Sequence, residues 1–178
     1  DYFFSGASAV KINANKIHDL AKNRSYAYMS LYGIYAYGYY AGVDFNITNN
    51  VIDLNGPYYI YGIYAYAYRA TGDHDIVNNT IRMTGNVTYS YTRHYGIYNY
   101  YAPSGDVKNN IIVDQTQNWG STNGGSWLIY TYNPQCTFDY NNLDNSTMAG
   151  SAMSNSNRHT AYNGGNRTTI ANWQGNAG

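Results

Sequence analysis

Two motifs recur along the chain with one shared period, and no other feature constrains the fold as strongly. The first motif is I-x-x-N-x-I, whose asparagines are 35, 29, 31 and 31 residues apart: Asn15, Asn50, Asn79, Asn110 and Asn141. The second motif begins Y-G-I-Y, and its isoleucines are 29, 34 and 32 residues apart: Ile34, Ile63, Ile97 and Ile129. Two independent motifs with a common period of about 31 residues predict a stacked, solenoid-like architecture.

Composition selects among the stacked architectures. The chain has 178 residues, with 24 Tyr, 18 Gly and 25 Asn but no Glu, so it lacks the residues from which helical repeats are built. Tyrosine favours strands, whereas asparagine and glycine favour turns. A propeller blade needs about 40 residues and four antiparallel strands, which is more than this repeat offers. The sequence therefore predicts an all-β fold, a parallel β-solenoid of about five coils of roughly 31 residues.

The recurring asparagine has a structural explanation in such a fold. Successive coils lie about 4.8 Å apart, so equivalent residues stack in columns. An inward asparagine side chain carries two donor hydrogens and an acceptor, which allows it to bond both the backbone of its own turn and the next asparagine. We expect Asn15, Asn50, Asn79, Asn110 and Asn141 to form an asparagine ladder.

These I-x-x-N-x-I rungs and G-I-Y segments, over roughly residues 9 to 145, resemble the right-handed parallel β-helix proteins of the pectate-lyase-like superfamily. The tail TTIANWQGNAG is loosely similar to a segment that closes the helix region in large bacterial surface and secreted β-helix proteins. The resemblance implies a right-handed β-helix, polysaccharide handling, and an extracellular or cell-surface location. We expect residues 1–145 to form the coils and residues 146–178 an irregular Gly/Asn/Ser-rich segment, the whole being part of a larger protein.

Strand alternation divides the tyrosines between two faces. With Ile34 inward, Tyr32 and Ala36 also point inward and Tyr35 and Tyr37 outward. An inner aromatic column is then predicted at Tyr32, Tyr61, Tyr95 and Trp127. Two outer columns are predicted at Tyr35, Tyr64, Tyr98 and Tyr130, and at Tyr37, Tyr66, Tyr100 and Tyr132. The opposite phase would expose four isoleucines, and such apolar columns invite association.

Eight outward tyrosines would form a broad patch with apolar ring faces and hydroxyl rims, which suits sugar rings or protein interfaces. We expect a non-catalytic module that binds polysaccharide or cell-surface glycan, or mediates adhesion, through these columns. One alternative is that the tyrosines only stabilise the sheet. Another is a structural spacer or filament subunit that self-associates through them.

Catalytic residues are harder to identify. The best local cluster is Asp73, His74 and Asp75, with Arg69 just upstream. The alternative function is a polysaccharide lyase or glycoside hydrolase, and this cluster supplies its candidate catalytic residues. Asp44, Asp73 and Asp106 lie in similar Gly-Asp or Gly-x-Asp turns and are weak candidates for Ca²⁺ ligands. Turn chemistry explains the same residues without any activity. The acid pairs and basic lyase motifs of the superfamily are not recognisable.

The remaining polar residues indicate little chemistry. Arg93 and His94 are interpreted as rim residues beside the tyrosines, and Arg82 and Asp53 as solvated flank. Cys136 is the single cysteine, so no disulfide is predicted, and it is expected to be a small buried residue. No cofactor is expected. Zero net charge without a basic cluster argues against nucleic acid, and no apolar run approaches the roughly 20 residues of a membrane helix.

Overall fold

A computed structural model describes residues 8–20, 29–38, 43–56, 58–67, 72–86, 91–101, 104–117, 125–132, 136–145, 158–163 and 166–167. All sixteen elements in these ranges are strands, and they form three sheets. The predicted all-β class is therefore confirmed. Arg69, Tyr39, Tyr40 and the TTIANWQGNAG tail lie outside the described residues, as does the side chain of Tyr132.

Each coil contributes one strand to each sheet. Sheet A contains β1 (Ser8–Asn13), β4 (Val43–Thr48), β7 (His74–Val77), β10 (Asp106–Lys108) and β13 (Thr137–Asp139). Sheet B contains β2 (Lys16–Leu20), β5 (Val51–Asn55), β8 (Thr80–Thr84), β11 (Ile111–Asp114) and β14 (Asn142–Asp144). Sheet C contains β3 (Ser30–Gly38), β6 (Tyr59–Ala67), β9 (Arg93–Tyr100), β12 (Gly125–Tyr132) and β15 (Arg158–Asn163), with β16 (Asn166–Arg167) antiparallel at its edge.

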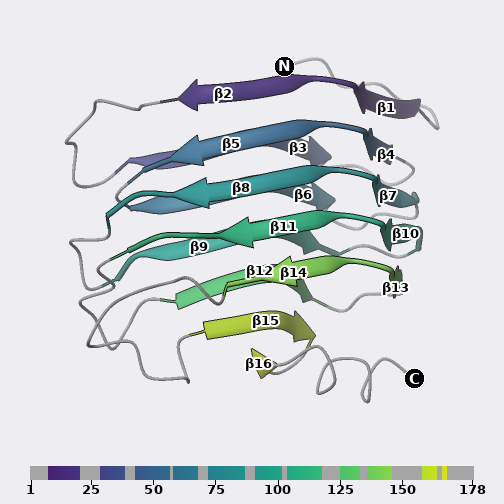
Figure 1. Cartoon of the computed structure of the whole chain (residues 1–178). Helices are drawn as coiled ribbons and strands as arrows, with labels where there is room; N and C mark the ends of the chain where they lie inside the picture. The colour runs from purple at the N-terminus through teal and green to yellow at the C-terminus, as the bar shows by residue number, and fades with distance from the viewer. Residues whose placement is uncertain are drawn as a thin grey trace.

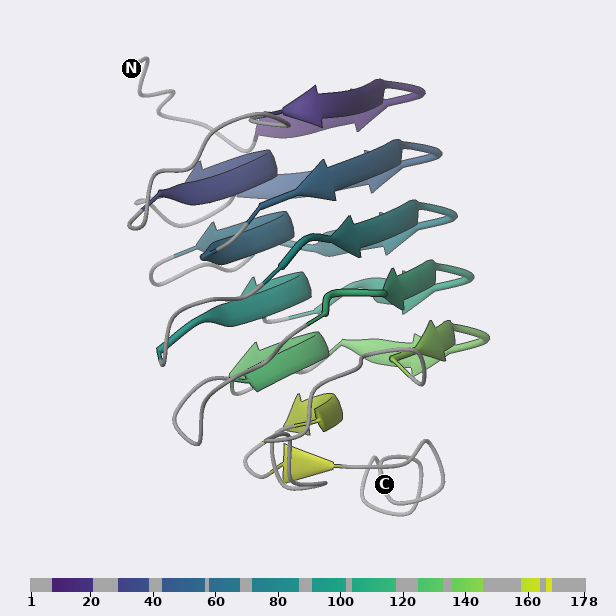
Figure 2. The same cartoon turned by 60° about the vertical axis from the view of Figure 1, so that its left-hand side comes forward.

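The strands pair in parallel from one coil to the next, as a solenoid requires. In Figure 1 sheet B crosses the front from right to left, and β3 and β6 return behind it while the chain descends from its N-terminus. A coil that turns this way is right-handed. Figure 2 shows the coils as successive layers, three of which, β4–β6, β7–β9 and β10–β12, have a neighbour on both sides.

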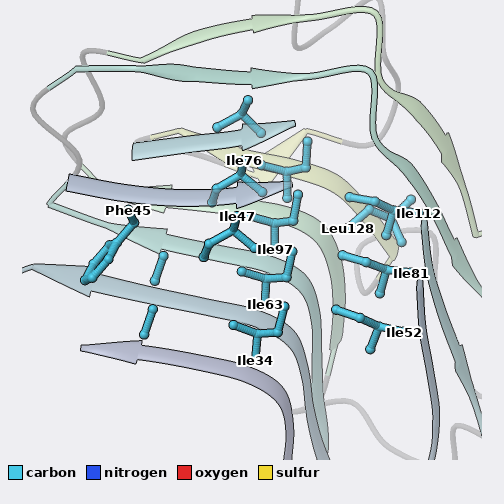
Figure 3. Packing of buried hydrophobic residues seen from close by; sticks show 14 of the residues in the cluster. Ile34, Phe45, Ile47, Ile52, Ile63, Ile76, Ile81, Ile97, Ile112 and Leu128 are labelled. Carbon is cyan, nitrogen blue, oxygen red and sulfur yellow. The ribbon is translucent and has the colours of Figure 1, made fainter. Parts of the chain in front are cut away.

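The core consists of columns of isoleucine that follow the predicted register. Ile34 pairs with Ile63, and Ile63 with Ile97, across sheet C. Ile52, Ile81 and Ile112 form the matching column in sheet B, and Figure 3 shows both columns pointing into the shared interior. Most of these side chains have no exposed surface. Since full burial of one such side chain contributes about 1.5–3 kcal/mol, the two columns hold sheets B and C together.

The asparagine ladder runs along the turn between sheets A and B. The side-chain nitrogens of Asn15, Asn50, Asn79 and Asn110 each donate to Oδ1 of the ladder asparagine in the next coil, at 2.9, 2.9, 3.1 and 2.9 Å. The residue before each ladder position has a positive φ, between 52° and 59°: Ala14, Asn49, Asn78, Asn109 and Tyr140. This left-handed residue makes the sharp turn that carries the next side chain inward.

The C-terminal part differs from the sequence-based expectation. Strands β15 and β16 fall within residues 146–178, for which an irregular segment was expected, and β15 extends sheet C by pairing with β12. The sequence of this strand, Arg158–Asn163, lacks the Y-G-I-Y motif, so the repeat alone does not reveal it.

Candidate functional site

The outer side of sheet C carries the tyrosines. The exposed fractions of Tyr35 and Tyr37 are 56% and 48%, whereas those of Ile34 and Ala36 are only 4%. This orientation is the predicted one. The Tyr35 column comprises Tyr35, Tyr64, Tyr98 and Tyr130, and the Tyr37 column comprises Tyr37, Tyr66 and Tyr100.

The predicted inward position of the Tyr32 column is wrong. This column, formed by Tyr32, Tyr61, Tyr95 and Trp127, packs edge-on against the Tyr35 column. The ring centroids of Tyr32 and Tyr35 are 5.1 Å apart with their planes at 83°. The residue before Tyr32 is Leu31, which is buried, so Tyr32 is on the outer side.

Glycine explains why alternation fails at this point. A Cβ added to Gly33 would lie 2.5 Å from Cγ2 of Ile52, so position 33 faces the core just as Ile34 does. Gly62 and Gly96 have the same relation to Ile81 and Ile112. Two consecutive inward positions reverse the phase of the strand, which turns the preceding aromatic residue outward. The outer side of sheet C therefore has three aromatic columns, together called the tyrosine face.

Rings within each column are stacked on one another. In the Tyr35 column, the centroids of successive rings are 4.9 Å apart and their planes agree within 9°. In the Tyr32 column, the spacing is 4.7 to 5.1 Å, and in the Tyr37 column it is 5.3 Å. Rings of the Tyr35 and Tyr37 columns are parallel, whereas those of the Tyr32 column stand nearly perpendicular to them. This is a herringbone pattern, and aromatic pairs of both geometries are favourable.

Stacking changes what the face presents to a ligand. A ring in an inner coil, such as Tyr64, has a neighbouring ring against each of its two faces. Its outer surface is therefore a ring edge with the phenolic hydroxyl, rather than the flat face expected from the sequence. Tyr35 and Tyr37 belong to β3, which is the edge strand of sheet C, and they are more exposed than the rings in the inner coils.

The hydroxyls of Tyr61, Tyr64 and Tyr98 stay protonated to a higher pH than that of free tyrosine. Burial, and secondarily the neighbouring phenols Tyr35 and Tyr32, raise the pKa of Tyr64 to about 12. The same causes raise the pKa of Tyr61 and Tyr98 further above the ordinary value of 10.0. Each neutral phenol is both a hydrogen-bond donor and an acceptor.

We expect this shift to appear in an alkaline titration. The folded protein favours neutral phenols, so the stability they contribute is complete below pH 10 and is lost as the pH rises through about 12. Ultraviolet absorbance of phenolate should show Tyr61, Tyr64 and Tyr98 ionising at a pH well above that of free tyrosine, together with loss of β-structure by circular dichroism. Ionisation of all tyrosines near pH 10 with the fold intact would contradict the stacked arrangement.

One charged residue borders the face. Arg93 lies at the first position of β9, and its guanidinium hydrogen-bonds the hydroxyl of Tyr95. The side chain is exposed, so Arg93 is the rim residue that the sequence suggested. His94 is not a rim residue, because its exposed fraction is 0%.

His94 belongs to a buried polar cluster that sequence reasoning missed. His94 Nδ1 is 3.3 Å from Oδ2 of Asp114, and both side chains are fully buried. The hydroxyl of Ser126 donates to Asp114 Oδ2 at 2.6 Å, and that of Thr116 to Asp114 Oδ1 at 2.5 Å. Burial by itself raises the pKa of Asp114, but His94 and the two hydroxyls outweigh it and lower the pKa. The repeat contained a sign of this cluster, because Asp114 stands at the position that the buried residue Met83 occupies in the previous coil.

The predicted catalytic candidates Asp73, His74 and Asp75 differ in how far they are buried. His74 is fully buried, and its Nδ1 is 2.7 Å from Oδ1 of Asn99, while its Nε2 has no hydrogen-bond partner among the described residues. Burial lowers the pKa of His74. Asp73 is exposed and accepts a hydrogen bond from the hydroxyl of Ser104. Asp75 accepts one from the backbone of Asp106 at 3.1 Å.

Two of the weak calcium candidates, Asp44 and Asp106, also have protein partners. Oδ1 of Asp44 accepts a hydrogen bond from the backbone nitrogen of Asp73 at 2.9 Å, and Asp106 is 2.9 Å from Nζ of Lys108. Across the described ranges, no three His, Cys, Asp or Glu side chains are grouped so as to hold a metal ion. Cys136 is partly buried, and its thiol donates to the carbonyl of Ser104 at 3.2 Å.

No family model matches the chain, and no curated protein or solved structure is detectably similar to it. The parallel β-solenoid is therefore established by the strand pairing itself. Within the described residues there is no helix long and apolar enough to cross a membrane.

Proposed function

We propose that this chain is a non-catalytic module of an extracellular or cell-surface protein, and that its tyrosine face binds a neutral polysaccharide. The observation that carries the proposal is the tyrosine face itself: three adjacent aromatic columns on the outer side of one sheet, with Tyr35 and Tyr37 half exposed. Ring edges with hydroxyls offer hydrogen bonds to sugar hydroxyls, and the ring carbons between them offer apolar contact. The resemblance of the repeats to pectate-lyase-like proteins is consistent with this ligand.

Two physical properties support a neutral ligand of extended shape. The columns run along the solenoid over four coils, so the same set of hydroxyls is offered repeatedly to a chain that lies along them. Arg93 at the margin is the one charged residue at the outward positions of β3, β6, β9 and β12 whose side chains are described. Stacking also holds the side chains in place before binding, which lowers the entropic cost of ordering them.

The alternative of a lyase or hydrolase receives less support from the described residues. Asp44 and Asp75 each accept a hydrogen bond from the backbone of the next coil, which is a structural role. His74, the base that such a reaction would need at this cluster, is fully buried. The function that the geometry supports best is therefore binding.

Two double variants test the proposal against immobilised neutral polysaccharides such as cellulose, xylan and mannan. Tyr64→Phe with Tyr98→Phe removes two hydroxyls while keeping the stacked rings, and should weaken retention about tenfold if each hydroxyl contributes about 0.5–1 kcal/mol. Tyr35→Ala with Tyr37→Ala removes exposed rings at the edge strand and should weaken it further. The matched control is Tyr140→Phe, because Tyr140 is 78% exposed on the turn between β13 and β14.

Retention that is unchanged in both double variants, or absent for the wild type on all three polysaccharides, would overturn the proposal. Sedimentation velocity of the same variants tests self-association through this face. A wild-type oligomer that Tyr35→Ala with Tyr37→Ala converts to monomer would assign the face to contacts between copies instead.

A further inference from the structure

A second concave surface lies at the far end of sheet B, where β5, β8 and β11 finish. Its volume is about 570 Å³, within the range of ligand pockets in proteins. Side chains from three successive coils line it: Asn55, Arg82, Thr84, Asn86, Gln115 and Gln117. None of these residues belongs to the tyrosine face, so the groove is a separate feature of the molecule.

The groove is unusual because every side chain that lines it is of a polar type. Pockets for small molecules are lined mainly by apolar and aromatic side chains, with a few polar groups. Here four of the side chains are primary amides, each with an NH₂ donor group and a carbonyl acceptor. Such a pair of donor and acceptor matches the hydroxyls of a sugar, each of which also donates and accepts.

A glycine, Gly85, is part of the groove lining. Gly85 has a φ of +137°, and a Cβ at this position would lie 2.4 Å from the carbonyl oxygen of Gly56 in the coil before. A side chain is therefore excluded from position 85, and the backbone itself lines the groove between Thr84 and Asn86.

Arg82 contacts side chains in the coils on both sides of its own. Its Nε donates to Oε1 of Gln115 in the next coil at 3.1 Å, and its Nη1 is 3.5 Å from Oδ2 of Asp53 in the previous coil. A guanidinium has five N–H donors, so further donors remain for a ligand. Asp53 balances the positive charge, and its carboxylate would repel an acidic ligand bound at Arg82.

We propose that the groove between Asn55, Arg82 and Gln117 binds a neutral saccharide of about two sugar units through hydrogen bonds from its amides and from Arg82. The site does not depend on the tyrosine face, although the two are close: in the coil of β5 and β6 only three residues separate Asn55 from Tyr59, where sheet C begins. A polysaccharide that lies on the tyrosine face would meet the groove around this corner.

The test uses the whole chain and side-chain amide resonances in ¹H–¹⁵N spectra. Cellobiose and maltose are the neutral probes, and glucuronate is the acidic one. At least one neutral disaccharide should shift the amide resonances of Asn55 and Gln117 and the Arg82 Nε resonance. The double variant Asn55→Ala with Gln117→Ala should weaken that binding about tenfold by removing two hydrogen-bonding amides.

Two controls separate this site from the tyrosine face and from general effects. Asn142→Ala removes an exposed amide in β14, outside the groove, and should leave binding unchanged. Tyr35→Ala with Tyr37→Ala should also leave the groove resonances responsive, even if that variant no longer binds polysaccharide. The inference is overturned if neither disaccharide moves the groove resonances, if the double variant binds as well as wild type, or if glucuronate binds more tightly than the neutral probes.

Discussion

Replacing Asn79 with alanine is expected to lower the free energy of unfolding by about 3–6 kcal/mol, because several buried polar groups lose their partners together. Oδ1 of Asn79 accepts hydrogen bonds from both the backbone and the side-chain nitrogen of Asn50, at 3.0 and 2.9 Å. Its Nδ2 donates to the carbonyl of Ile47 at 2.8 Å and to Oδ1 of Asn110 at 3.1 Å. Asn79 is fully buried, so water cannot replace these bonds.

The matched control for this substitution is Asn15→Ala at the first rung. Asn15 is exposed, and its side-chain nitrogen donates to Asn50 at 2.9 Å from the open end of the ladder. Its loss should cost about 1 kcal/mol. Urea denaturation followed by circular dichroism measures both values. Equal losses at the two positions would show that burial within the ladder is not what makes these hydrogen bonds matter.

The substitution Asp114→Ala is expected to cost about 3–5 kcal/mol, since it leaves His94 buried without its carboxylate. The hydroxyls of Ser126 and Thr116 would also lose their bonds to Asp114, although the Thr116 hydroxyl keeps its contact with His94 Nδ1 at 3.0 Å. An exposed carboxylate provides the comparison. Asp53, whose side chain is 46% exposed, pairs with Arg82 at 3.5 Å, and Asp53→Ala should change stability by less than about 1 kcal/mol.

The cluster also predicts a pH dependence with a definite sign. The pKa of Asp114 in the folded protein is below its usual value of 3.8. Its contribution to stability is therefore present above that pH and is lost as the pH falls through the lowered pKa. In urea titrations between pH 7 and pH 2, the difference between wild type and Asp114→Asn should shrink at the acidic end. A difference that stays constant would contradict the charged state of Asp114.

The sequence predicted the repeating parts of the fold because a repeat shows the same physical requirement several times. Five asparagines at one spacing identify a buried ladder, and Ile34, with its equivalents, marks the core position of sheet C. The same residue type occurs at the equivalent position of several coils, so an accidental match is improbable. The positions of Tyr35 and Tyr37 follow from the same register by alternation alone.

The errors arose where the repeat carries a local irregularity. Simple alternation places Gly33 on the outer face, yet its close approach to Ile52 shows that it faces the core. The residue before it, Tyr32, therefore faces outward instead of inward. His94 follows Arg93 directly in the sequence, but neighbouring residues of a strand point to opposite faces. Arg93 is therefore exposed at the rim, whereas His94 belongs to the buried cluster. The groove combines residues from three coils, and its shape depends on side-chain positions that no motif encodes.

The register shared by the ladder, isoleucine and tyrosine columns makes the coil a unit of length. In the main columns isoleucine meets isoleucine, asparagine meets asparagine and tyrosine meets tyrosine between neighbouring coils, so along these columns each coil offers its successor a surface like the one it received. Stability in such proteins is a sum of contributions from neighbours along one dimension. A gene that duplicates or deletes one whole repeat would thus join matching surfaces, and the tyrosine face would grow or shrink by one row of rings without any new interface having to evolve.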